Sequence, residues 1–369
     1  MPRTPPSGRE LGHALALRTR LLAALLAAAA LGGIALKLGS DRPARAGTHT
    51  SQKPSKATVS FAAVGDIAMV ANSDGGASYF ASIKRYLRGG VVLGNLEGTL
   101  TERGGSKCGS GSSSCFAFRA PPSYVSLLTR AGFTIMNLAN NHAYDYGSVG
   151  QTDTVAALDR AGLRHTGRPG EIAVLNVRGV KVALLGFAAY PWAQSLTDVG
   201  AARALVRKAD AAADLVVVTM HAGAEGSSAN HVRPGVEYFL GENRGNPVAF
   251  THAVVEAGAD LVVGHGPHVL RGMEWYRGRL IAYSMGNFVG CHTLSTSGVL
   301  SLSGVLRATL RADGSWVRGE LVPVRMVGCG VPERDPAEAA HGFVRELSKQ
   351  DFGRLGMRIS RAGILLPPG

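Results

Sequence analysis

Six apolar runs of this sequence end in side chains that could bind a metal ion or transfer a proton. In chain order, these side chains are Asp66, Asn95, Glu97, Asn140, Asn141, His142, His221, Glu225, His265, His268 and Asn287. Carboxylate, amide and imidazole groups are ligands of Mn, Zn, Fe or Mg in proteins. Two such ions, about 4 Å apart and bridged by one carboxylate, would need many ligands from different strands. The pattern therefore predicts a divalent-metal centre whose metal the sequence does not identify.

Each of these residues also has a simpler interpretation when it is taken alone. Asp66 could cap a helix, Glu97 could be a surface acid, and His221 could be a buried core histidine. The Gly-His-Gly-Pro-His segment at 264–268 is more specific, because two imidazoles separated by a rigid proline seldom arise by chance. The sequence has no Gly-x-Ser-x-Gly elbow, Walker loop or Gly-x-Gly-x-x-Gly motif. The joint pattern thus favours metal chemistry over the other common catalytic systems.

The elements that must hold these residues alternate between short apolar runs and amphipathic runs. Predicted strands, rich in Val, Ile and Leu, lie at 59–65, 91–95, 133–139, 181–187, 215–220, 261–265 and 279–284. Predicted helices at 121–132, 148–162 and 246–258 are bounded by proline or glycine. Such alternation predicts an α/β fold, in which ligands gather at the carboxyl ends of the strands.

The C-terminal part of the sequence has a different texture. From residue 298 it predicts two β-strands around the Asp313-Gly314 turn, followed by a helix near 335–350. No internal repeat is present, so we expect one catalytic domain over residues 58–369.

Five segments between about residues 58 and 330 follow one another in the order "VGDIAM", "GNLEGTLT", "NLANNHAYDYG", "HAGAEG" and "GADLVVGHGPHVLRGMEWYRGRLIAYSMGNF". These segments resemble the successive signature blocks of the CapA family of capsule-synthesis proteins, named for poly-gamma-glutamate capsules. The family is similar to calcineurin-like metallophosphoesterases. The resemblance implies a four-layer α-β-β-α sandwich, in which two packed mixed sheets are flanked by helices.

The resemblance also implies roles for the candidate residues. It implies a first metal bound by Asp66 and His268, a second bound by Asn141, His221 and His265, and Glu97 bridging the two. His142 would act on the substrate as a proton donor or anion stabiliser, and we expect Asp145 to orient it. The expected substrate-binding residues are Arg119, Glu225 and Asn287, although Arg119 could equally be an ordinary charge at a helix edge.

This sequence departs from the family pattern at four positions. Ala68 stands where phosphoesterases have a histidine of the first motif, which would weaken the first metal site. Ala222 and Gly226 replace two aromatic residues of many relatives, and Gly266 stands where many relatives have a third histidine. These departures predict a more open pocket floor.

The N-terminal residues predict export from the cytoplasm. Residues 1–38 combine four arginines with a sixteen-residue uncharged apolar run, as signal peptides and membrane anchors do. Residues 39–57 are polar and predict a flexible linker. We expect membrane anchoring with an extracytoplasmic body, or alternatively secretion after cleavage near Ala46.

The charge of the chain indicates an anionic partner rather than nucleic acid. The net charge is +13, and residues 1–56, with nine Lys/Arg and two Asp/Glu, account for +7 of it. The remaining +6 suits an anionic polymer or its precursor. No stripe of basic and aromatic residues of the kind that binds nucleic acid is present in the body.

The four cysteines fit an oxidising compartment. Cys108 and Cys115 bracket a flexible Gly/Ser stretch, whereas Cys291 and Cys329 lie far apart. Four cysteines allow three pairings, of which we favour 108–115 with 291–329.

These observations predict an extracytoplasmic CapA-like protein of anionic capsule or envelope polymer biosynthesis. It would be a metal-dependent hydrolase, with polymer synthase and export proteins as partners. The alternative is a non-catalytic accessory protein that binds or anchors the polymer during export.

Overall fold

The computed structural model describes residues 56–109 and 115–369. The predicted signal or anchor segment 1–38, the cleavage site near Ala46 and nearly all of the predicted linker lie outside the described residues. Within the described residues, no helix is long and apolar enough to cross a membrane. Lys53–Gly369 forms one compact unit.

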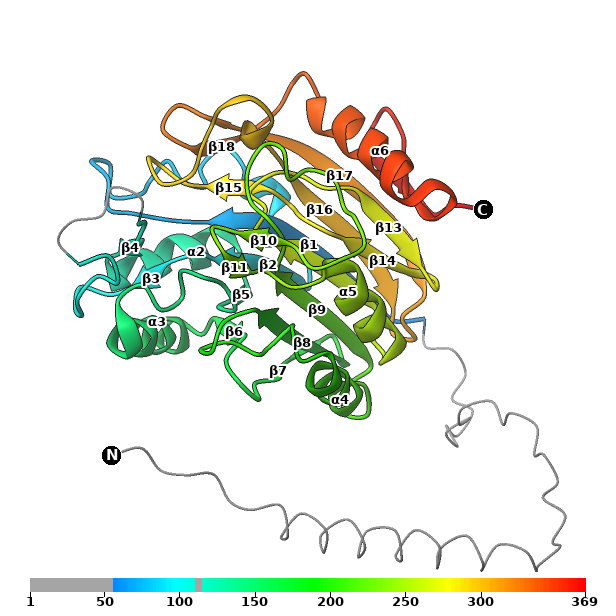
Figure 1. Cartoon of the computed structure of the whole chain (residues 1–369), viewed down its shortest axis with the longest axis horizontal. Helices are drawn as coiled ribbons and strands as arrows, with labels where there is room; N and C mark the ends of the chain where they lie inside the picture. Colours follow the sequence, from blue (N-terminus) through cyan, green and yellow to red (C-terminus); the bar gives the residue numbers. More distant parts are fainter. Residues whose placement is uncertain (1–55, 110–114) are drawn as a thin grey trace, which may run out of the picture. The chain divides into compact units, whose positions relative to one another are not determined.

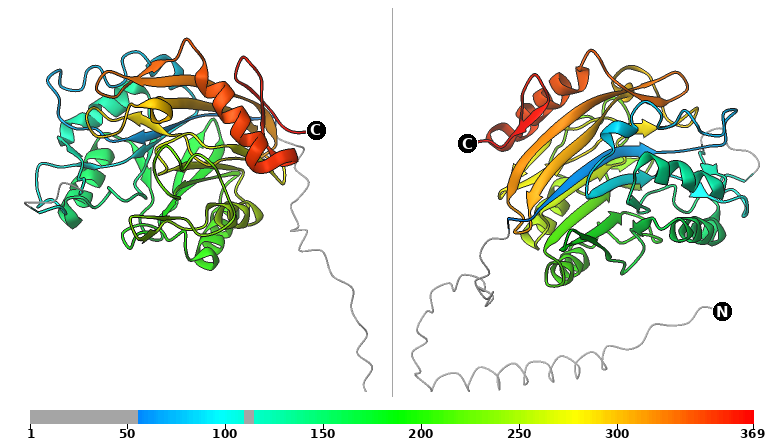
Figure 2. Two further views of the ribbon diagram at one scale, coloured as in Figure 1. Left: turned by 45° about the horizontal axis from the view of Figure 1, so that its top comes forward. Right: turned by 180° about the vertical axis from the view of Figure 1, so that it is seen from behind.

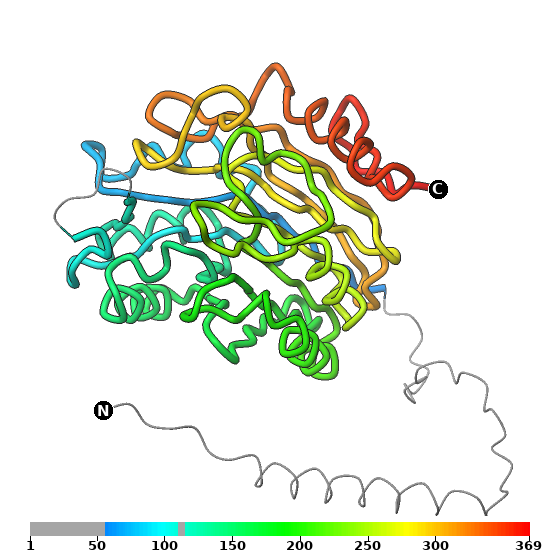
Figure 3. Tube along the Cα trace, viewed as in Figure 1, coloured from blue at the N-terminus to red at the C-terminus, as the bar shows by residue number. Residues whose placement is uncertain are grey.

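The larger of two main sheets contains ten strands and is built around β1. Eight strands follow the order β19-β20-β17-β16-β1-β2-β5-β6, while β15 pairs with β1 and β18 with β17. Their bounds are β1 Thr58–Ile67, β2 Val91–Leu96, β5 Ile135–Asn137, β6 Arg164–Thr166, β15 Asn287–Val289, β16 Leu302–Arg311, β17 Trp316–Val327, β18 Val331–Arg334, β19 Arg358–Ile359 and β20 Ile364–Leu366. In Figure 3, blue β1 runs between the orange strands and the cyan ones, so the sheet joins both ends of the described chain.

The smaller sheet has six strands in the order β13-β14-β12-β9-β8-β7. Their bounds are β7 Ala173–Val177, β8 Val180–Ala188, β9 Leu215–His221, β12 Leu261–His265, β13 Met273–Tyr276 and β14 Arg279–Ala282. Two short ladders complete the strands: β3 Thr99–Leu100 with β4 Arg119–Ala120, and β10 Tyr238–Phe239 with β11 Glu242–Asn243. The central strands β8, β9, β12 and β14 are parallel, as the near-continuous apolar runs predict.

The two sheets pack face to face on one apolar core. Phe61 and Leu93 of the larger sheet belong to the same buried cluster as Val217, Val263 and Leu280 of the smaller sheet. Alternate side chains of β1, such as Ala62 and Val64, point to the opposite face and join a second cluster. Because both faces of the central strands are buried, their register is strongly specified.

Helices cover the outer faces of both sheets, which confirms the predicted four-layer arrangement (Figure 1). The larger sheet is covered by α2 and α3, and the smaller sheet by α4 and α5, while α6 packs beside β13 and β19. The helices are α2 Val125–Ala131, α3 Gly147–Arg160, α4 Val199–Asp210, α5 Pro247–Glu256 and α6 Ala339–Phe352, with 3-10 turns η1 Lys84–Tyr86, η2 Pro122–Tyr124, η3 Gly298–Ser301 and η4 Gly353–Leu355.

One expectation about strand ends is wrong in detail. Asn287 does not end the strand that begins at Arg279, because β14 stops at Ala282 and Asn287 begins β15 in the other sheet. Gly286 has φ +67°, which turns the chain between the sheets. Gly65 packs directly against Gly286, and a Cβ on Gly65 would lie 1.9 Å from the Gly286 carbonyl oxygen. The chain therefore crosses from the smaller sheet to the larger one just before Asn287, which places Asn287 at the edge where β1 ends.

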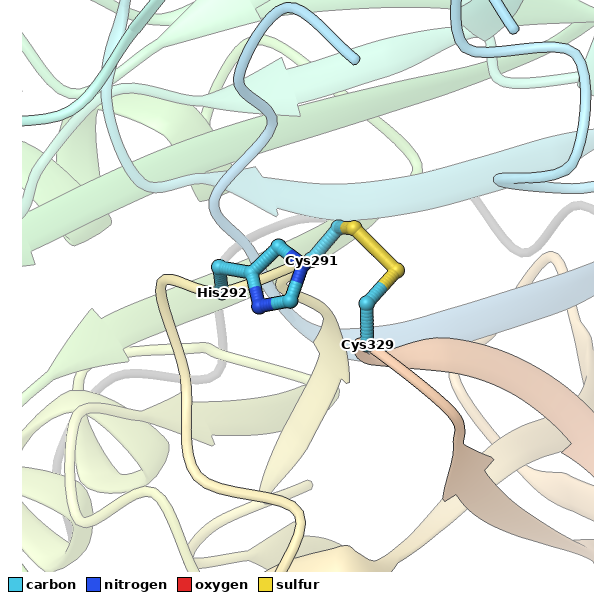
Figure 4. A group of neighbouring side chains, drawn as sticks. All are labelled: Cys291, His292 and Cys329. Carbon is cyan, nitrogen blue, oxygen red and sulfur yellow. A yellow bond between two sulfur atoms is a disulfide. The ribbon is translucent and has the colours of Figure 1, made fainter. Parts of the chain in front are cut away.

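Both favoured cysteine pairs are confirmed as disulfides. Cys108 is bonded to Cys115, and Cys291 to Cys329. The second bond ties the segment after β15 to the turn between β17 and β18 (Figure 4).

Candidate metal centre

The carboxyl ends of parallel strands from both sheets meet at one place. In the larger sheet, Asp66 of β1 lies in register with Asn95 of β2, which is itself in register with Asn137 of β5. In the smaller sheet, His221 of β9 is in register with His265 of β12. The backbone N–H of Gly266 donates to Asp66 across the junction at 3.4 Å. Parallel pairing thus aligns the predicted residues at one edge, as their positions after apolar runs predict.

Five of the six predicted metal ligands form one cluster, in which His268 is half-buried and the other four are buried. Their facing atoms lie within 3.1 to 3.7 Å in the pairs His268–Asp66, His268–Glu97, His221–Glu97 and His265–Asp66. Asp66, Glu97 and His268 each offer a ligand atom, and these three atoms lie within 4.8 Å of one another. The side chains come from different sheets and loops, so only the folded chain brings them together.

Glu97 and His265 show that this cluster fits a cation. Both carboxylate oxygens of Glu97 and both ring nitrogens of His265 are buried, and neither group has a hydrogen-bond partner within residues 56–109 and 115–369. A buried group without a partner is costly to leave unsatisfied. Burial, followed by the charges of Asp66 and Glu225, raises the pKa of Glu97 well above its ordinary value, although His268 opposes this. A divalent cation coordinated by these atoms would satisfy them and stabilise the ionised carboxylate.

Without such a cation, Asp66 and His268 form a charged pair. Burial raises the pKa of Asp66, but the hydrogen bond and charge of His268 outweigh it, and the pKa lies below its ordinary value. Burial lowers the pKa of His268, whereas Glu97 and Asp66 raise it to about 10. Metal ligation would therefore have to displace a proton from His268.

The two histidines of the smaller sheet are held in the neutral form. Burial lowers the pKa of His221 well below its ordinary value, against the opposing charge of Asp66. Burial likewise lowers the pKa of His265 to about 4. Neutral imidazole is the form that binds a metal ion, so these two side chains are ready for ligation at neutral pH.

Asn95 links the parts of the cluster, a role that sequence reasoning did not assign to it. Its Nδ2 donates to Asp66 at 2.8 Å and lies 3.3 Å from His221 Nδ1. Its Oδ1 accepts hydrogen bonds from Asn137 at 2.8 Å and Asn140 at 3.1 Å. Its position at a strand end was visible in the sequence, but these long-range partners were not. The amide network fixes the orientation of Asp66 and His221.

Asn141, the sixth predicted ligand, is placed differently. Among the described residues, its side chain has no hydrogen bond or ion pair with the five clustered ligands. Its Oδ1 is nevertheless buried without a hydrogen-bond partner, as the oxygens of Glu97 are. Its backbone oxygen accepts from Lys107 at 3.3 Å. The atom that the family resemblance assigns to a metal is thus still available to bind one.

The structure brings His142 and Asp145 together as expected. The Nδ1 atom of His142 lies 2.8 Å from Asp145 Oδ2, which also accepts from the Phe118 N–H at 2.6 Å. Lys107 lies 2.7 Å from the other oxygen of Asp145. Burial lowers the pKa of His142 below its ordinary value, although Asp145 opposes this. The neutral ring, with Nδ1 bonded to Asp145, leaves Nε2 for another partner.

A cavity of about 210 Å³ opens beside the cluster. His142, His268, Glu225, Asn287 and Gly226 line it on the polar side, and the rest of its wall is largely apolar, namely Phe116, Phe118, Phe239, Leu294 and Leu300 with Thr293 and Ser295. Among the predicted substrate-binding residues, Glu225 and Asn287 are therefore in place. Asn287 also fixes His268, since its Oδ1 lies 2.9 Å from His268 Nδ1.

Arg119 lies elsewhere. It is exposed on β4, its guanidinium lies 4.6 Å from the centre of the Tyr146 ring, and it lines a separate shallow cleft with Thr101 and Glu102. It is not among the residues that line the cavity. Nothing in the sequence distinguishes an arginine that lines the cavity from an exposed arginine that lies outside it.

Arg244 is the charged group of this site that sequence reasoning missed. It is only 2% exposed, and its Nη2 lies 2.6 Å from Glu225 Oε1 and 3.4 Å from His221 Nε2. Its segment, between β11 and α5, has no apolar periodicity, so nothing in the local sequence indicated burial. The guanidinium neutralises Glu225 at the edge of the candidate centre.

Three of the departures from the family pattern, Ala68, Gly226 and Gly266, lie at or near the candidate centre. Ala68 is fully buried, and its backbone oxygen accepts from Thr293 at 2.7 Å. Gly266 has φ +108°, and a Cβ there would lie 3.0 Å from His221 Cδ2. The floor at Gly266 is therefore filled by His221 rather than open, whereas Gly226 does line the cavity.

A second group of possible ligands, Cys291, His292 and Cys329, does not compete with this centre (Figure 4). Its two sulfur atoms are bonded to each other, so neither is available as a thiolate ligand.

The two packed mixed sheets flanked by helices, with polar side chains gathered at their joined edge, define the fold class as a four-layer α-β-β-α sandwich. Residues 60–291 match the family described as "Bacterial capsule synthesis protein PGA_cap", and the chain belongs to this family. The CapA resemblance in the sequence is thereby confirmed.

Two curated relatives carry names of the same kind. The chain is 38% identical over 186 residues to a capsule biosynthesis protein CapA of Bacillus anthracis, covering 45% of this chain and 42% of the relative. It is 30% identical over 250 residues to a PGA biosynthesis protein CapA of Bacillus subtilis, covering 61% and 62%. The chain thus spans less than two thirds of the length of either relative.

Among solved structures, the chain is similar to a putative 5'-nucleotidase from Staphylococcus aureus. The TM-score is 0.45 at 16% identity, over 79% of this chain and 58% of the other. Nothing about activity follows from a likeness of this degree.

Proposed function

We propose that this protein takes part in the synthesis of an anionic capsule or envelope polymer of the poly-gamma-glutamate type. We further propose that its cluster is a divalent-metal centre that hydrolyses a bond in the polymer or its precursor. The observation that carries the proposal is Glu97: its two buried oxygens lack a hydrogen-bond partner among the described residues, while ring nitrogens of His221 and His268 lie 3.7 and 3.6 Å from Oε1. Membership of a family described by capsule synthesis supports a capsule polymer as the target of this protein.

The residues divide into metal ligands and substrate groups. Asp66, Glu97, His221, His265 and His268 would hold the ion or ions, with Asn141 as a further oxygen donor. A bound divalent ion supplies activation of water and neutralisation of developing negative charge. Mn, Zn, Fe and Mg all fit this mixture of oxygen and nitrogen donors.

His142 is the group of this chain placed to exchange a proton with substrate. It lines the cavity, and Asp145 holds its Nδ1, so Nε2 is the atom left to interact with a ligand. Because burial lowers its pKa, the ring is neutral at neutral pH and Nε2 accepts a proton before it can donate one. His142 would therefore act as the proton donor expected from the sequence only after it has accepted a proton.

Metal analysis of the purified full-length protein tests the proposal. His221→Ala and His268→Ala should each lower the bound divalent metal, whereas His292→Ala, which changes an exposed imidazole, should leave it unchanged. Metal should also raise the unfolding temperature of the wild type more than that of the two variants, since only the folded state has the site. Equal metal content in all four proteins would overturn the metal centre.

A non-catalytic accessory function is the second candidate. Two observations favour it: Ala68 replaces a histidine of the first motif, and the described residues that line the cavity include no lysine or arginine to hold an anionic chain at the centre. Assays of the metal-loaded protein on phosphodiester, glycan and polyglutamate substrates separate the two functions. Metal-dependent turnover supports the hydrolase, and its absence for all three classes supports the accessory protein.

We also propose that the body works outside the cytoplasm, attached to the membrane or released after cleavage. The charge and apolar pattern of residues 1–38 supports export, and two disulfides suit an oxidising compartment. A reporter that is active only outside the cytoplasm, fused after residue 60, should be active. An inactive fusion would contradict export, and the size of the product would distinguish cleavage near Ala46 from anchoring.

A further inference from the structure

A second polar cleft lies on the outer face of the larger sheet, away from the candidate metal centre. It has a volume of about 490 Å³, and its side chains include Ser60, Arg88, Arg307, Thr309, Arg318 and Glu320. Ser60 precedes Asp66 by six residues on β1, which places it about 20 Å away along the strand. None of the residues that line this cleft also lines the cavity at the metal centre.

The strands put these side chains on one face in adjoining rows. Ser60, Thr309 and Arg318 are successive neighbours across β1, β16 and β17, and Arg307 is paired with Glu320 in the next row. In Figure 2, right, α2 and α3 lie over the blue and cyan strands rather than over the orange β16 and β17. Among the described residues, no helix covers this part of the outer face, so it is left to water or to a ligand.

The charges of this cleft are unbalanced. Arg307 donates a hydrogen bond to Glu320 at 2.6 Å, and the charges of these two side chains neutralise each other. Arg88 and Arg318 are exposed, and within residues 56–109 and 115–369 neither has an ion-pair partner. Arg88 is held near the strands by its loop, because the Gly90 N–H donates to Ser60 Oγ at 3.1 Å. Two unpaired guanidinium groups therefore face one cleft, and guanidinium binds carboxylate through paired hydrogen bonds.

The cavity at the metal centre lacks this property. Among the described residues, no lysine or arginine lines it, and its carboxylate Glu225 is already paired with Arg244. A chain of repeated carboxylates would find unpaired cations in the strand cleft and an apolar wall at the centre. The strand cleft is thus suited to binding the carboxylates of a polymer, whereas the cavity at the metal centre is not.

We propose that the strand cleft binds an anionic polymer chain, with carboxylates of the polymer on Arg88 and Arg318 while Arg307 stays paired with Glu320. The choice of a polycarboxylate rests on the function proposed above, whereas the site itself rests on the cleft and its arginines. No bond is made or broken there. The cleft would hold the chain while the metal centre, or a partner protein, acts on another part of it.

Binding of labelled poly-gamma-glutamate to the full-length protein tests this inference. The double variant Arg88→Gln/Arg318→Gln should bind about tenfold more weakly or worse, because each arginine contributes a charge-assisted hydrogen bond. The control Arg233→Gln/Arg354→Gln removes the same charge from two exposed positions outside the cleft and should bind like the wild type. Free glutamate should compete poorly, and added salt should weaken binding.

The outcomes separate the cleft from the proposed metal centre. Both double variants should keep the metal content of the wild type, so a loss of binding with normal metal supports the cleft. Equal binding by the two double variants would overturn the cleft. Loss of binding in His268→Ala but not in Arg88→Gln/Arg318→Gln would also overturn it and would locate the polymer at the metal centre. Binding of polyphosphate but not of polyglutamate would overturn the polycarboxylate assignment.

Discussion

The guanidinium of Arg244 lies between the Glu225 carboxylate and the His221 imidazole, with Nη2 3.4 Å from His221 Nε2. Burial opposes its charge, but Glu225 keeps the pKa of Arg244 above its ordinary value, so the group remains a cation. A fixed positive charge therefore stands beside atoms that we expect to bind a divalent cation. Such a charge weakens cation binding unless its carboxylate partner compensates.

Replacing Arg244 should strengthen metal binding while weakening the fold. Arg244→Met removes the charge next to His221 and frees Glu225, so we expect about tenfold tighter binding of a divalent metal. The same change leaves the Glu225 carboxylate without its partner in the metal-free protein, which should lower the unfolding temperature. Competition with a chelator of known affinity measures the first effect, and thermal unfolding with and without metal measures the second.

Arg279→Met is the matched control for this prediction. It breaks an ion pair with Asp260, 3.1 Å long, that lies outside the candidate centre. The control should lose stability without any gain in metal affinity. Unchanged or weaker metal binding in Arg244→Met would show that its guanidinium does not act on the bound cation.

The two disulfides should contribute unequally to stability. The chain-entropy estimate depends on the length of the closed loop, and the sequence separations are 38 for Cys291–Cys329 and 7 for Cys108–Cys115. It gives about 4 kcal/mol for the first bond and about 2 kcal/mol for the second. Urea unfolding of the Cys291→Ser/Cys329→Ser and Cys108→Ser/Cys115→Ser double variants measures both contributions. A larger loss in the second double variant would contradict this ranking.

The candidate site was predictable where it depends on strand ends. Asp66, His221 and His265 follow apolar runs, and parallel pairing brings the ends of such runs to one edge whatever the order of the strands. Arg244 was not predictable, because its burial depends on residues distant in the sequence, and no local pattern distinguishes it from exposed arginines. The crossing of the chain at Asn287 was hidden for the same reason, since it depends on the close packing of Gly65 against Gly286.

The fold was more predictable than its irregular parts. The predicted strands at 91–95, 215–220 and 261–265 lie within β2, β9 and β12, because continuous apolar runs leave little freedom of assignment. The helix α4 was missed, although Asp198 carries a signal for its start by accepting a hydrogen bond from the Ala201 N–H. Its first turns are rich in alanine and glycine, which weakens the apolar period that would have indicated a helix.

Asp260 should make stability fall as the pH rises through the acidic range. Burial raises its pKa from 3.8 to about 6, although the Val216 N–H donates to it at 2.9 Å. Between about pH 4 and 6 the folded state keeps a proton that the unfolded state has released, so rising pH favours unfolding in this window. Above about pH 6 the effect is constant, at up to about 3 kcal/mol.

The variant Asp260→Asn removes this titration and isolates its contribution. Its free energy of unfolding in urea should improve relative to the wild type between pH 4.5 and 7. Other groups titrate in both proteins, so the difference between the two proteins is the quantity to compare. A constant difference across this range would show that Asp260 has an ordinary pKa in the folded state.

His142 should matter for chemistry but not for holding the metal. It is held by Asp145 and packed on Phe118, with 4.2 Å between the ring centres, and in the described part of the chain it makes no hydrogen bond or ion pair with Asp66 or Glu97. His142→Ala should therefore keep the metal content and the fold of the wild type. Any substrate that the wild type hydrolyses should be turned over about 10²–10⁴-fold more slowly, which is the usual worth of acid–base catalysis.

Comparison of His142→Ala with His221→Ala decides between hydrolase and accessory protein even if no substrate is found in vitro. Loss of metal together with activity in His142→Ala would make His142 a ligand instead. In cells, a hydrolase requires both side chains, because one handles protons and the other holds the metal. Loss of the polymer in both variants supports catalysis. Normal polymer with His142→Ala, but loss with His221→Ala at equal protein levels, would mean that the centre has a structural role and that the protein acts by binding.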